Sequence, residues 1–202
     1  MQQGHQTREA PESLPGAVQS SLLFSVITPS FNCRDFIWDN IRSVREQGFG
    51  PDQLEHWIID GGSTDGTLDL LRGEPGIQWI SESDRGLSDA VNKGIQRARG
   101  DWIIWLNADD LLAPGACRSV LESARHHPDI RIFCGALAVL RYDGSVEQTV
   151  PAWDYNLRDL LGTRTGMNQP STFVHRSVYE KVGLLDVSSR YAMDYEWLVR
   201  AM

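Results

Sequence analysis

Two adjacent aspartates, Asp109 and Asp110, follow the apolar segment Trp102 to Leu106, which has the composition of a buried strand. Neighbouring carboxylates repel each other, and a divalent cation relieves that repulsion because carboxylate oxygens are its ligands. The pair therefore predicts a Mg²⁺ or Mn²⁺ site, with Asp109 as the stronger candidate ligand. The alternative is that Asp110 caps the following turn and Asp109 is merely solvated.

Three more polar or glycine-rich segments follow apolar ones in the same way. They are Thr28 to Asn32, Asp60 to Thr67 and Glu82 to Gly86, after apolar segments at 22–28, 54–59 and 77–81. Ligands of open parallel sheets bind outside the carboxyl ends of the strands. Four such segments at one sheet edge predict a binding site there.

Asp60 ends its strand and precedes Gly61 and Gly62, which would let a planar ligand approach the backbone. A carboxylate in this place can accept a hydrogen bond from the N–H of a nucleobase. The alternative is an aspartate that only forms the turn. Both interpretations remain open from these residues alone.

Asp84 and Gly86 precede the start of an expected helix, where anions bind readily. Asp89 and Asn92 are three residues apart on that helix and so share one side. The alternative is an ordinary solvated face. Asp194, near the aromatic residues Tyr195 and Trp197, could act as a general base or could simply cap a helix.

Alternating strands and helices must position these residues. Helices are expected at about 35–48, 64–71, 87–99 and 114–126, between and after the four strands. This order predicts a mainly parallel sheet with right-handed crossovers. The second half predicts one strand over 130–141, a turn at Asp143-Gly144, a returning strand over 145–150, a glycine-containing loop at 162–168, and helices over 177–182 and from about Asp194.

The length of 202 residues predicts a single domain, 22–202, after a polar tail at 1–21 that we expect to be disordered. The formal net charge of −8 argues against nucleic acid as a partner. Three cysteines without metal-type spacing, no apolar run long enough for a membrane span and no signal-peptide pattern predict a cytoplasmic protein.

Five segments, taken together and in order, resemble glycosyltransferase family 2. They are SVITPSFN, IIDGGSTDGT, SDRGLSDAVNKGI, GDWIIWLNADD and AMDYEWLVR, and the resemblance extends from Phe24 to Arg200. It implies the GT-A fold, a Rossmann-like α/β architecture whose mainly parallel sheet is flanked by helices, with a smaller mixed acceptor-side portion. Residues 22–112 would be the nucleotide-sugar-binding half. Residues 113–202 would be the acceptor-side half, which ends earlier than is usual in the family.

The resemblance also implies an activity: inverting transfer of a sugar from a nucleotide-diphosphate donor, with a UDP-sugar favoured and GDP or dTDP as alternatives. The acceptor would be a glycan or a lipid-linked molecule of bacterial surface polysaccharide assembly. The cofactor would be Mg²⁺ or Mn²⁺. A cytoplasmic location at the inner face of the membrane, with peripheral association, would suit such an acceptor.

Residue roles follow from the matching motifs. Asp194 would be the catalytic base, and Asp109 and Asp110 the metal ligands, with Asn107 in place of the first Asp of the family's Asp-any-Asp motif. The implied donor-binding residues are Pro29, Ser30, Phe31, Asn32, Asp60, Gly62, Asp84, Gly86, Asp89, Asn92, Asn107, Ala108 and Asp109. On the acceptor side, Gln169, Ser171 and His175 would face the site, although His175 suits a packed position equally well.

Three other classes share parts of this pattern. A nucleotidyltransferase would need a glycine-rich basic loop after the first strand, and TPSFNCRD contains no glycine. A dinucleotide-dependent oxidoreductase would need G-x-G-x-x-G there, which is also missing. The third is a catalytically silent nucleotide-sugar-binding domain, which the short C-terminal half favours.

Overall fold

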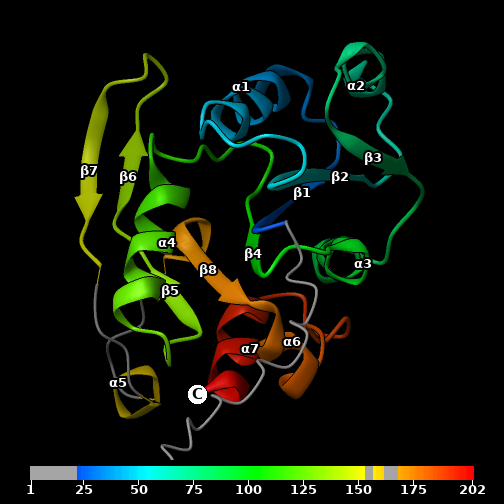
Figure 1. Cartoon of the computed structure of the whole chain (residues 1–202). Coiled ribbons are helices and arrows are strands. Elements are labelled where there is room, and N and C mark those ends of the chain that lie inside the picture. Colours follow the sequence, from blue (N-terminus) through cyan, green and yellow to red (C-terminus); the bar gives the residue numbers. More distant parts are fainter. Residues whose placement is uncertain (1–21, 153–156, 162–167) are drawn as a thin grey trace, which may run out of the picture.

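The computed structural model describes residues 22–152, 157–161 and 168–202 (Figure 1). The expected tail at 1–21 and residues 162–167 of the expected loop lie outside the described residues. The strands are β1 (Phe24–Ser30), β2 (Leu54–Asp60), β3 (Gln78–Ser81), β4 (Trp102–Trp105), β5 (Ile132–Cys134), β6 (Leu137–Leu140), β7 (Val146–Val150) and β8 (Thr172–His175). The helices are α1 (Arg34–Arg45), α2 (Thr67–Gly73), α3 (Leu87–Arg97), α4 (Ala116–His126), α5 (Leu157–Leu161), α6 (Arg176–Val182), α7 (Met193–Ala201) and the 3-10 helix η1 (Gln169–Ser171).

Six strands form the main sheet, in the order β3-β2-β1-β4-β8-β5. The first four are parallel to one another, and β8 runs antiparallel to both of its neighbours. The prediction of a mainly parallel α/β sheet flanked by helices is therefore confirmed. Strands β6 and β7 form a separate two-stranded sheet, drawn at the left in Figure 1.

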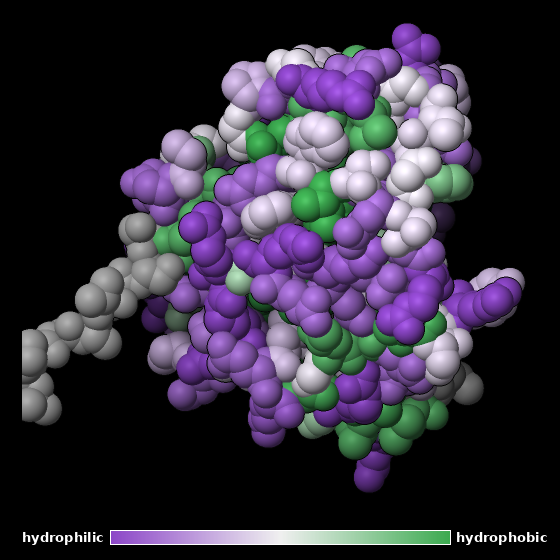
Figure 2. Space-filling model, turned by 90° about the vertical axis from the view of Figure 1, so that its right-hand side faces the viewer, coloured by the Kyte–Doolittle hydropathy of each residue, from purple (hydrophilic) through white to green (hydrophobic). Residues whose placement is uncertain are grey.

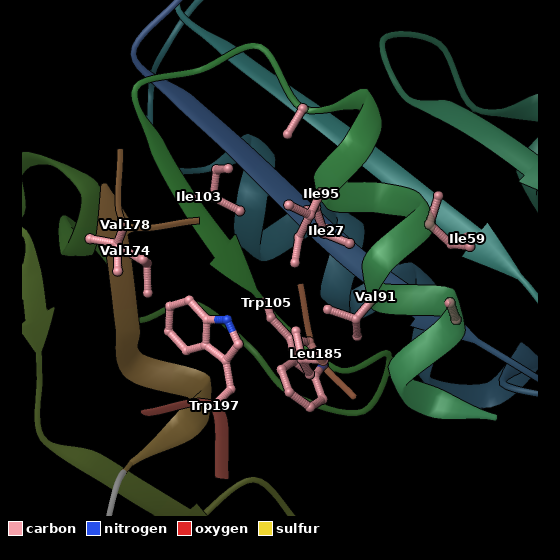
Figure 3. Packing of buried hydrophobic residues seen from close by; sticks show 12 residues of the cluster. Ile27, Ile59, Val91, Ile95, Ile103, Trp105, Val174, Val178, Leu185 and Trp197 are labelled. Atoms are coloured by element: carbon pink, nitrogen blue, oxygen red, sulfur yellow. The ribbon is translucent and has the colours of Figure 1, made fainter. Parts of the chain in front are cut away.

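Apolar clusters lie on both faces of the main sheet, which explains why its strands are apolar throughout. On one face, Ile27 and Ile103 pack with Val91 of α3, Val178 of α6 and Trp197 of α7 (Figure 3). The cluster on the other face holds Phe24, Val26 and Ile104 with side chains from α1 and α4. The parallel strands are thus enclosed between two helical layers.

The surface on the β3 side of the molecule is largely hydrophilic, with apolar side chains only in small separate patches (Figure 2). Such isolated patches are ordinary on a protein surface. Within the described residues, no helix combines the length and apolar character that crossing a bilayer requires.

Strand β1 continues through Pro29, where the sequence suggested an end. The carbonyl of Ile27 accepts from Leu106 on the β4 side, and Ser30 accepts from Gly61 on the β2 side. Because successive residues of a strand bond to opposite sides, Pro29 faces β4, whose pairing with β1 ends at Ile27. The N–H that proline lacks is therefore not needed, and β1 extends to Ser30.

The prediction of a single strand over 130–141 is wrong, because the segment forms two strands that belong to different sheets. Strand β5 pairs with β8, and β6 pairs with β7. The chain leaves the main sheet at Gly135, whose N–H donates to the carbonyl of Ser171. Strand β8 itself was not expected, since four residues are too few for a hydrophobic period to be recognised.

His56 of β2 is a buried polar residue within this core. Its Nε2 lies 2.8 Å from Oγ1 of Thr28 on β1. Burial, with a smaller contribution from the charge of Arg45, lowers the pKa of His56 from 6.5 to about 3. The imidazole is therefore neutral in the folded protein at neutral and mildly acidic pH.

This lowered pKa predicts acid sensitivity. Below pH 6.5 the unfolded chain binds a proton at His56 and the folded chain does not, so stability is complete above pH 6.5 and falls as the pH decreases toward 3. We expect the unfolding free-energy difference between wild type and His56→Gln to be about 2 kcal/mol smaller at pH 5 than at pH 7. Urea unfolding at both pH values measures it, and equal differences would contradict the assignment.

Candidate functional site

The strand register brings the expected loops to one edge of the sheet. Ser30 pairs with Asp60, and Asp60 pairs with Ser81, so β1, β2 and β3 end side by side. Strand β4 is parallel to β1 and ends at Trp105, opposite Ile27. The segment after β4 therefore emerges at the same edge as the other three loops, as the sequence predicted.

Asp60 is completely buried, and its carboxylate is occupied by its own loops. One oxygen accepts from the N–H groups of Gly62 and Ser63, at 3.0 and 2.9 Å, and from the Ser81 hydroxyl at 2.7 Å. The other accepts from the Ser63 hydroxyl. Asp60 thus fixes the turn after β2, and Gly62 takes part through its backbone at a positive φ of 90°.

Asp84 and Phe31 face each other across the bare backbone of Gly61. A Cβ atom placed on Gly61 would lie 2.6 Å from Oδ2 of Asp84 and 3.4 Å from the Phe31 ring. The other oxygen of Asp84 accepts from the N–H of Gly86 at 2.8 Å. Phe31 is 62% exposed, so an aromatic surface and a carboxylate oxygen border a strip of backbone without side chains.

Asn32 clamps the first two loops together. Its side-chain oxygen accepts from the N–H of Thr64 at 2.9 Å, and its own N–H donates to the Ser63 hydroxyl at 2.8 Å. Its φ of 53° is left-handed, a conformation that asparagine tolerates better than most residues.

In the described part of the chain, the buried Ser30 hydroxyl has no hydrogen-bond partner.

Asp89 and Asn92 of α3 have separate surroundings. The backbone N–H of Arg85 is the main cause of a lowered pKa at Asp89, which also pairs with the Arg85 guanidinium and with Lys93. The amide of Asn92 is buried and bonds both the N–H and the carbonyl of Leu185, at 3.0 and 2.8 Å. Asn92 therefore ties α3 to the segment that leads to α7, while Asp89 lies in the first turn of the helix beside Arg85.

The acidic turn, defined here as Asn107 to Asp110, follows β4. The N–H of Asp110 donates to the carbonyl of Asn107 at 3.0 Å, and the Asn107 amide donates to the Asp110 carboxylate at 3.1 Å. Asp109 is exposed, whereas Ala108 is buried in the core. Burial, followed by the negative charge of Asp109, raises the pKa of Asp110.

This donor set fits a divalent cation. Burial and, to a smaller extent, the negative charge of Asp109 raise the pKa of Asp110 and so disfavour its ionised form. A cation beside Asp109 and Asp110 would favour the ionised form. Among the described residues, no group of three or more His, Cys, Asp or Glu side chains gathers as a metal site. The protein would thus supply two carboxylates and leave other positions to phosphate and water, as is usual for Mg²⁺.

Gln169 connects the acidic turn to a cavity that contains Asp194. Its side-chain oxygen accepts from the Asn107 amide at 3.3 Å, and its nitrogen donates to the carbonyl of Trp105. The Trp105 indole in turn donates to Asn107 at 2.8 Å. The cavity is lined by Trp105, Gln169, Thr172, Val174, Tyr179, Leu185, Asp194 and Trp197.

Asp194 lies in the first turn of α7, which begins after Ala192 in a left-handed conformation. Trp197, one turn later, stacks on Tyr179 with ring centroids 4.5 Å apart and donates to the carbonyl of Gly183 at 2.8 Å. Trp197, Trp105 and Leu185 lie on the same side of the sheet (Figure 3). This packing holds the carboxylate of Asp194 at a largely apolar cavity.

Two of the expected acceptor-side residues have other surroundings. The Ser171 hydroxyl lies within hydrogen-bond distance of the carbonyls of Gly135 and Asn168, at 2.9 and 3.0 Å, and its single proton is directed at them. His175 caps α6 through Ser177 and pairs with Trp102, at the end of β4 opposite to the acidic turn. The structure therefore does not bring His175 to the site, because β8 is antiparallel and runs away from the loop edge.

Asn40 of α1 contacts the acidic turn and was not expected from the sequence. It is completely buried, and its amide donates to the carbonyls of Asn107 and Asp110, both at 2.9 Å. The available signal was its spacing, since Ile37, Asn40, Ile41 and Val44 share the buried face of one helix. A polar residue on an otherwise apolar face needs a buried partner.

Comparison with known proteins gives a consistent result. Residues 25–183 match the family model described as Glycosyl transferase family 2. An uncharacterized glycosyltransferase of Mycobacterium tuberculosis is 34% identical over 182 residues, which are 88% of this chain and 68% of the relative. A PGL/p-HBAD biosynthesis glycosyltransferase of the same species is 28% identical over 189 residues, 88% of this chain and 69% of the relative.

Solved structures share the fold at low identity. TarS of S. aureus, crystallised as residues 1–349 with UDP, has a TM-score of 0.72 at 17% identity and covers 89% of this chain. The mannosyltransferase PcManGT of Pyrobaculum calidifontis, in complex with GDP-Man and Mn²⁺, has a TM-score of 0.63 at 22% identity and covers 88% of this chain. The chain spans about half the length of these structures, 55% and 51%. By its matching motifs, its fold and its M. tuberculosis relative, the chain belongs to glycosyltransferase family 2.

Proposed function

We propose that this chain catalyses inverting transfer of a sugar from a nucleotide-diphosphate donor, with a UDP-sugar favoured and GDP or dTDP as alternatives, to a glycan or lipid-linked acceptor of the bacterial surface. One observation carries the proposal. Gln169 hydrogen-bonds the acidic turn and lines the cavity of Asp194, so a candidate cation site and a candidate base adjoin. Leaving-group stabilisation and deprotonation of the acceptor need these two functions close together.

The bonds that change are those at the anomeric carbon. Asp194 accepts the proton of the acceptor hydroxyl as that oxygen bonds the anomeric carbon from one side. The bond from this carbon to the phosphate oxygen breaks on the opposite side, and the electron pair leaves with the nucleoside diphosphate. The configuration is therefore inverted. A cation held by Asp109 and Asp110 would supply positive charge to the diphosphate.

The donor proposal assigns the nucleobase to the strip of backbone at Gly61. Phe31 offers a ring for stacking, and Oδ2 of Asp84 offers an acceptor for a base N–H. Asp60 already accepts from four donors, so we propose that it shapes this loop and that Asp84 meets the base. The structural neighbours were solved with UDP or with GDP-Man and Mn²⁺, which supports a nucleotide donor and a divalent cation.

The acceptor proposal rests on the relatives. One is named for PGL/p-HBAD biosynthesis. A lipid-linked acceptor would present its hydroxyl at a membrane. We therefore propose a cytoplasmic location at the inner membrane face, with peripheral association. The cavity at Asp194 would receive the acceptor hydroxyl.

The test is turnover of UDP-, GDP- and dTDP-sugars, including donor hydrolysis, with Mn²⁺ and with a chelator. We expect turnover of one donor class with Mn²⁺ and its loss with the chelator. Equal rates under both conditions would remove the metal from the proposal. Binding of a nucleoside diphosphate in a thermal-shift screen, without hydrolysis or transfer, would instead support a silent nucleotide-sugar-binding domain.

Gly61→Ala should weaken binding of the preferred nucleoside diphosphate by about 5- to 100-fold. The added methyl would lie 2.6 Å from Asp84 and would displace its carboxylate, and overpacking of this kind costs about 1–3 kcal/mol. Calorimetric titration measures the change. Gly73→Ala is a matched control, because a Cβ there meets nothing within 4 Å. Equal affinities of Gly61→Ala and wild type would show that the base binds elsewhere.

A further inference from the structure

Helix α1 and the turn that follows it carry a polar seam, defined here as Asn40, Ser43 and Gln47. All three side chains are buried. Asn40 and Ser43 are three residues apart and share one face of the helix, and the Gln47 amide donates back to the carbonyl of Ser43 at 3.1 Å. Each one bonds the backbone of the segment that follows β4. Their partners are the carbonyls of Asn107, Asp110 and Ala113 and the N–H groups of Leu112 and Cys117.

Each member of the seam bonds a different part of the segment after β4. Asn40 alone bonds the acidic turn, and its two amide hydrogens reach the carbonyls of the first and last residues of the turn. Gln47 bonds Ala113 and Cys117, beyond the turn. Asn40 therefore closes the acidic turn, whereas Gln47 anchors the start of α4.

Hydrogen bonds that involve Thr28 and His56 fix the orientation of the Asn40 amide. Its oxygen lies 3.3 Å from Oγ1 of Thr28, which lies 2.8 Å from Nε2 of His56. Both Asn40 N–H groups are engaged, so its oxygen accepts the Thr28 proton, and Thr28 accepts from the N–H of His56. A flipped Asn40 amide would direct its oxygen at two carbonyl oxygens and its nitrogen at the Thr28 donor.

The hydrogen-bonded series Thr28, Asn40 and His56 is buried, so the loss of any one partner should affect the others. Thr28, Asn40 and His56 are each at most 3% exposed, so water is poorly placed to replace a lost partner. Unpaired buried groups favour rearrangement of the backbone that they held. The backbone concerned carries Asp109 and Asp110, whose mutual repulsion favours opening of the turn.

We infer that Asn40 is a positioning residue for the cation, holding Asp109 and Asp110 in a binding geometry through the acidic turn while Thr28 and His56 fix its amide. This rests on the proposed function. Mg²⁺ and Mn²⁺ require closely defined ligand positions, and residues that hold metal ligands usually affect affinity by about 10- to 100-fold. Asn40 contacts the backbone of the turn and touches neither substrate nor cation.

The experiment compares Asn40→Ala, Thr28→Val and Gln47→Ala. Mn²⁺ affinity is measured in the presence of UDP, GDP or dTDP by loss of the free-Mn²⁺ EPR signal, with a protein-free nucleotide blank. Thermal midpoints are measured in parallel. Gln47→Ala is the matched control, since it also removes buried hydrogen bonds from the seam to the segment after β4.

We expect Asn40→Ala to weaken Mn²⁺ binding by about 10- to 100-fold. Thr28→Val, which keeps the side-chain shape, should weaken it in the same direction but less. Gln47→Ala should stay within about threefold of wild type despite a lower thermal midpoint. If Asn40→Ala does not fold, the Mn²⁺ affinity of Thr28→Val compared with that of Gln47→Ala tests the inference.

Two results would overturn the inference. Equal Mn²⁺ affinities of the Thr28 and Asn40 variants and the Gln47 control would show that the seam acts on stability alone, and the proposed function would stand. A wild-type protein that binds no Mn²⁺ with any of the three nucleoside diphosphates would overturn the proposed cation site, and this inference with it.

Discussion

Asp194→Asn should lower turnover by about 10²- to 10⁴-fold, the usual contribution of a general base, while nucleoside diphosphate affinity stays close to wild type. Asparagine has the shape of aspartate but does not accept a proton at neutral pH. Asp194 lines a cavity walled by Trp105, Leu185 and Trp197, which leaves few other groups to accept the proton of an acceptor hydroxyl there. Steady-state rates and calorimetric titration of the nucleoside diphosphate measure the two quantities.

Glu196→Gln is the matched control for this prediction. Glu196 lies in the same turn of α7, but its carboxylate pairs with Arg200 and is partly exposed. The same change of charge should therefore leave turnover within about twofold, since exposed pairs contribute little to stability. Full turnover by Asp194→Asn would mean that another group is the base.

Asp109→Asn should reduce turnover by about 100-fold or more at moderate Mn²⁺, and should raise the Mn²⁺ concentration needed for half-maximal rate. The variant removes one of the two carboxylates of the acidic turn. It also removes a charge that raises the pKa of Asp110, so Asp110 should ionise more readily and retain part of the cation affinity. The rate measured as a function of Mn²⁺ concentration checks both effects.

Asp69→Asn makes the same charge change on the exposed surface of α2, where Asp69 pairs with Arg72. It should leave the Mn²⁺ dependence unchanged. Identical Mn²⁺ curves for Asp109→Asn and wild type would place the cation, if one is used, away from the acidic turn.

The parallel part of the fold was predictable because each of its strands and helices has a recognisable local sequence pattern. Apolar runs such as Trp102 to Leu106 are strands buried on both faces, and the polar segment after each run marks its carboxyl end. Once the strands are parallel, these ends must share one edge. The grouping of Asp60, Asp84 and Asp109 at that edge follows from the order of elements alone.

The acceptor side was less predictable because its contacts come from distant parts of the chain. Strand β8 is only four residues long and lies between β4 and β5 in the sheet. Of the strand expected over 130–141, only β5 pairs with β8. The antiparallel direction of β8 is a matter of tertiary pairing. That direction carries His175 to the far end of β4 and leaves Gln169 beside the acidic turn.

By itself, then, the sequence determined the parallel α/β framework, the edge on which chemistry can occur and the carboxylates found there. These depend on local periodicity and on the order of elements. Only the tertiary structure decided which carboxylates already have partners, as Asp60 has, and which buried amide holds the acidic turn, as Asn40 does. Asn40 bonds carbonyls 67 and 70 residues further along the chain, and Asp60 bonds Ser81 on a neighbouring strand as well as its own turn. Contacts between distant segments depend on tertiary packing, and a local sequence pattern does not record them.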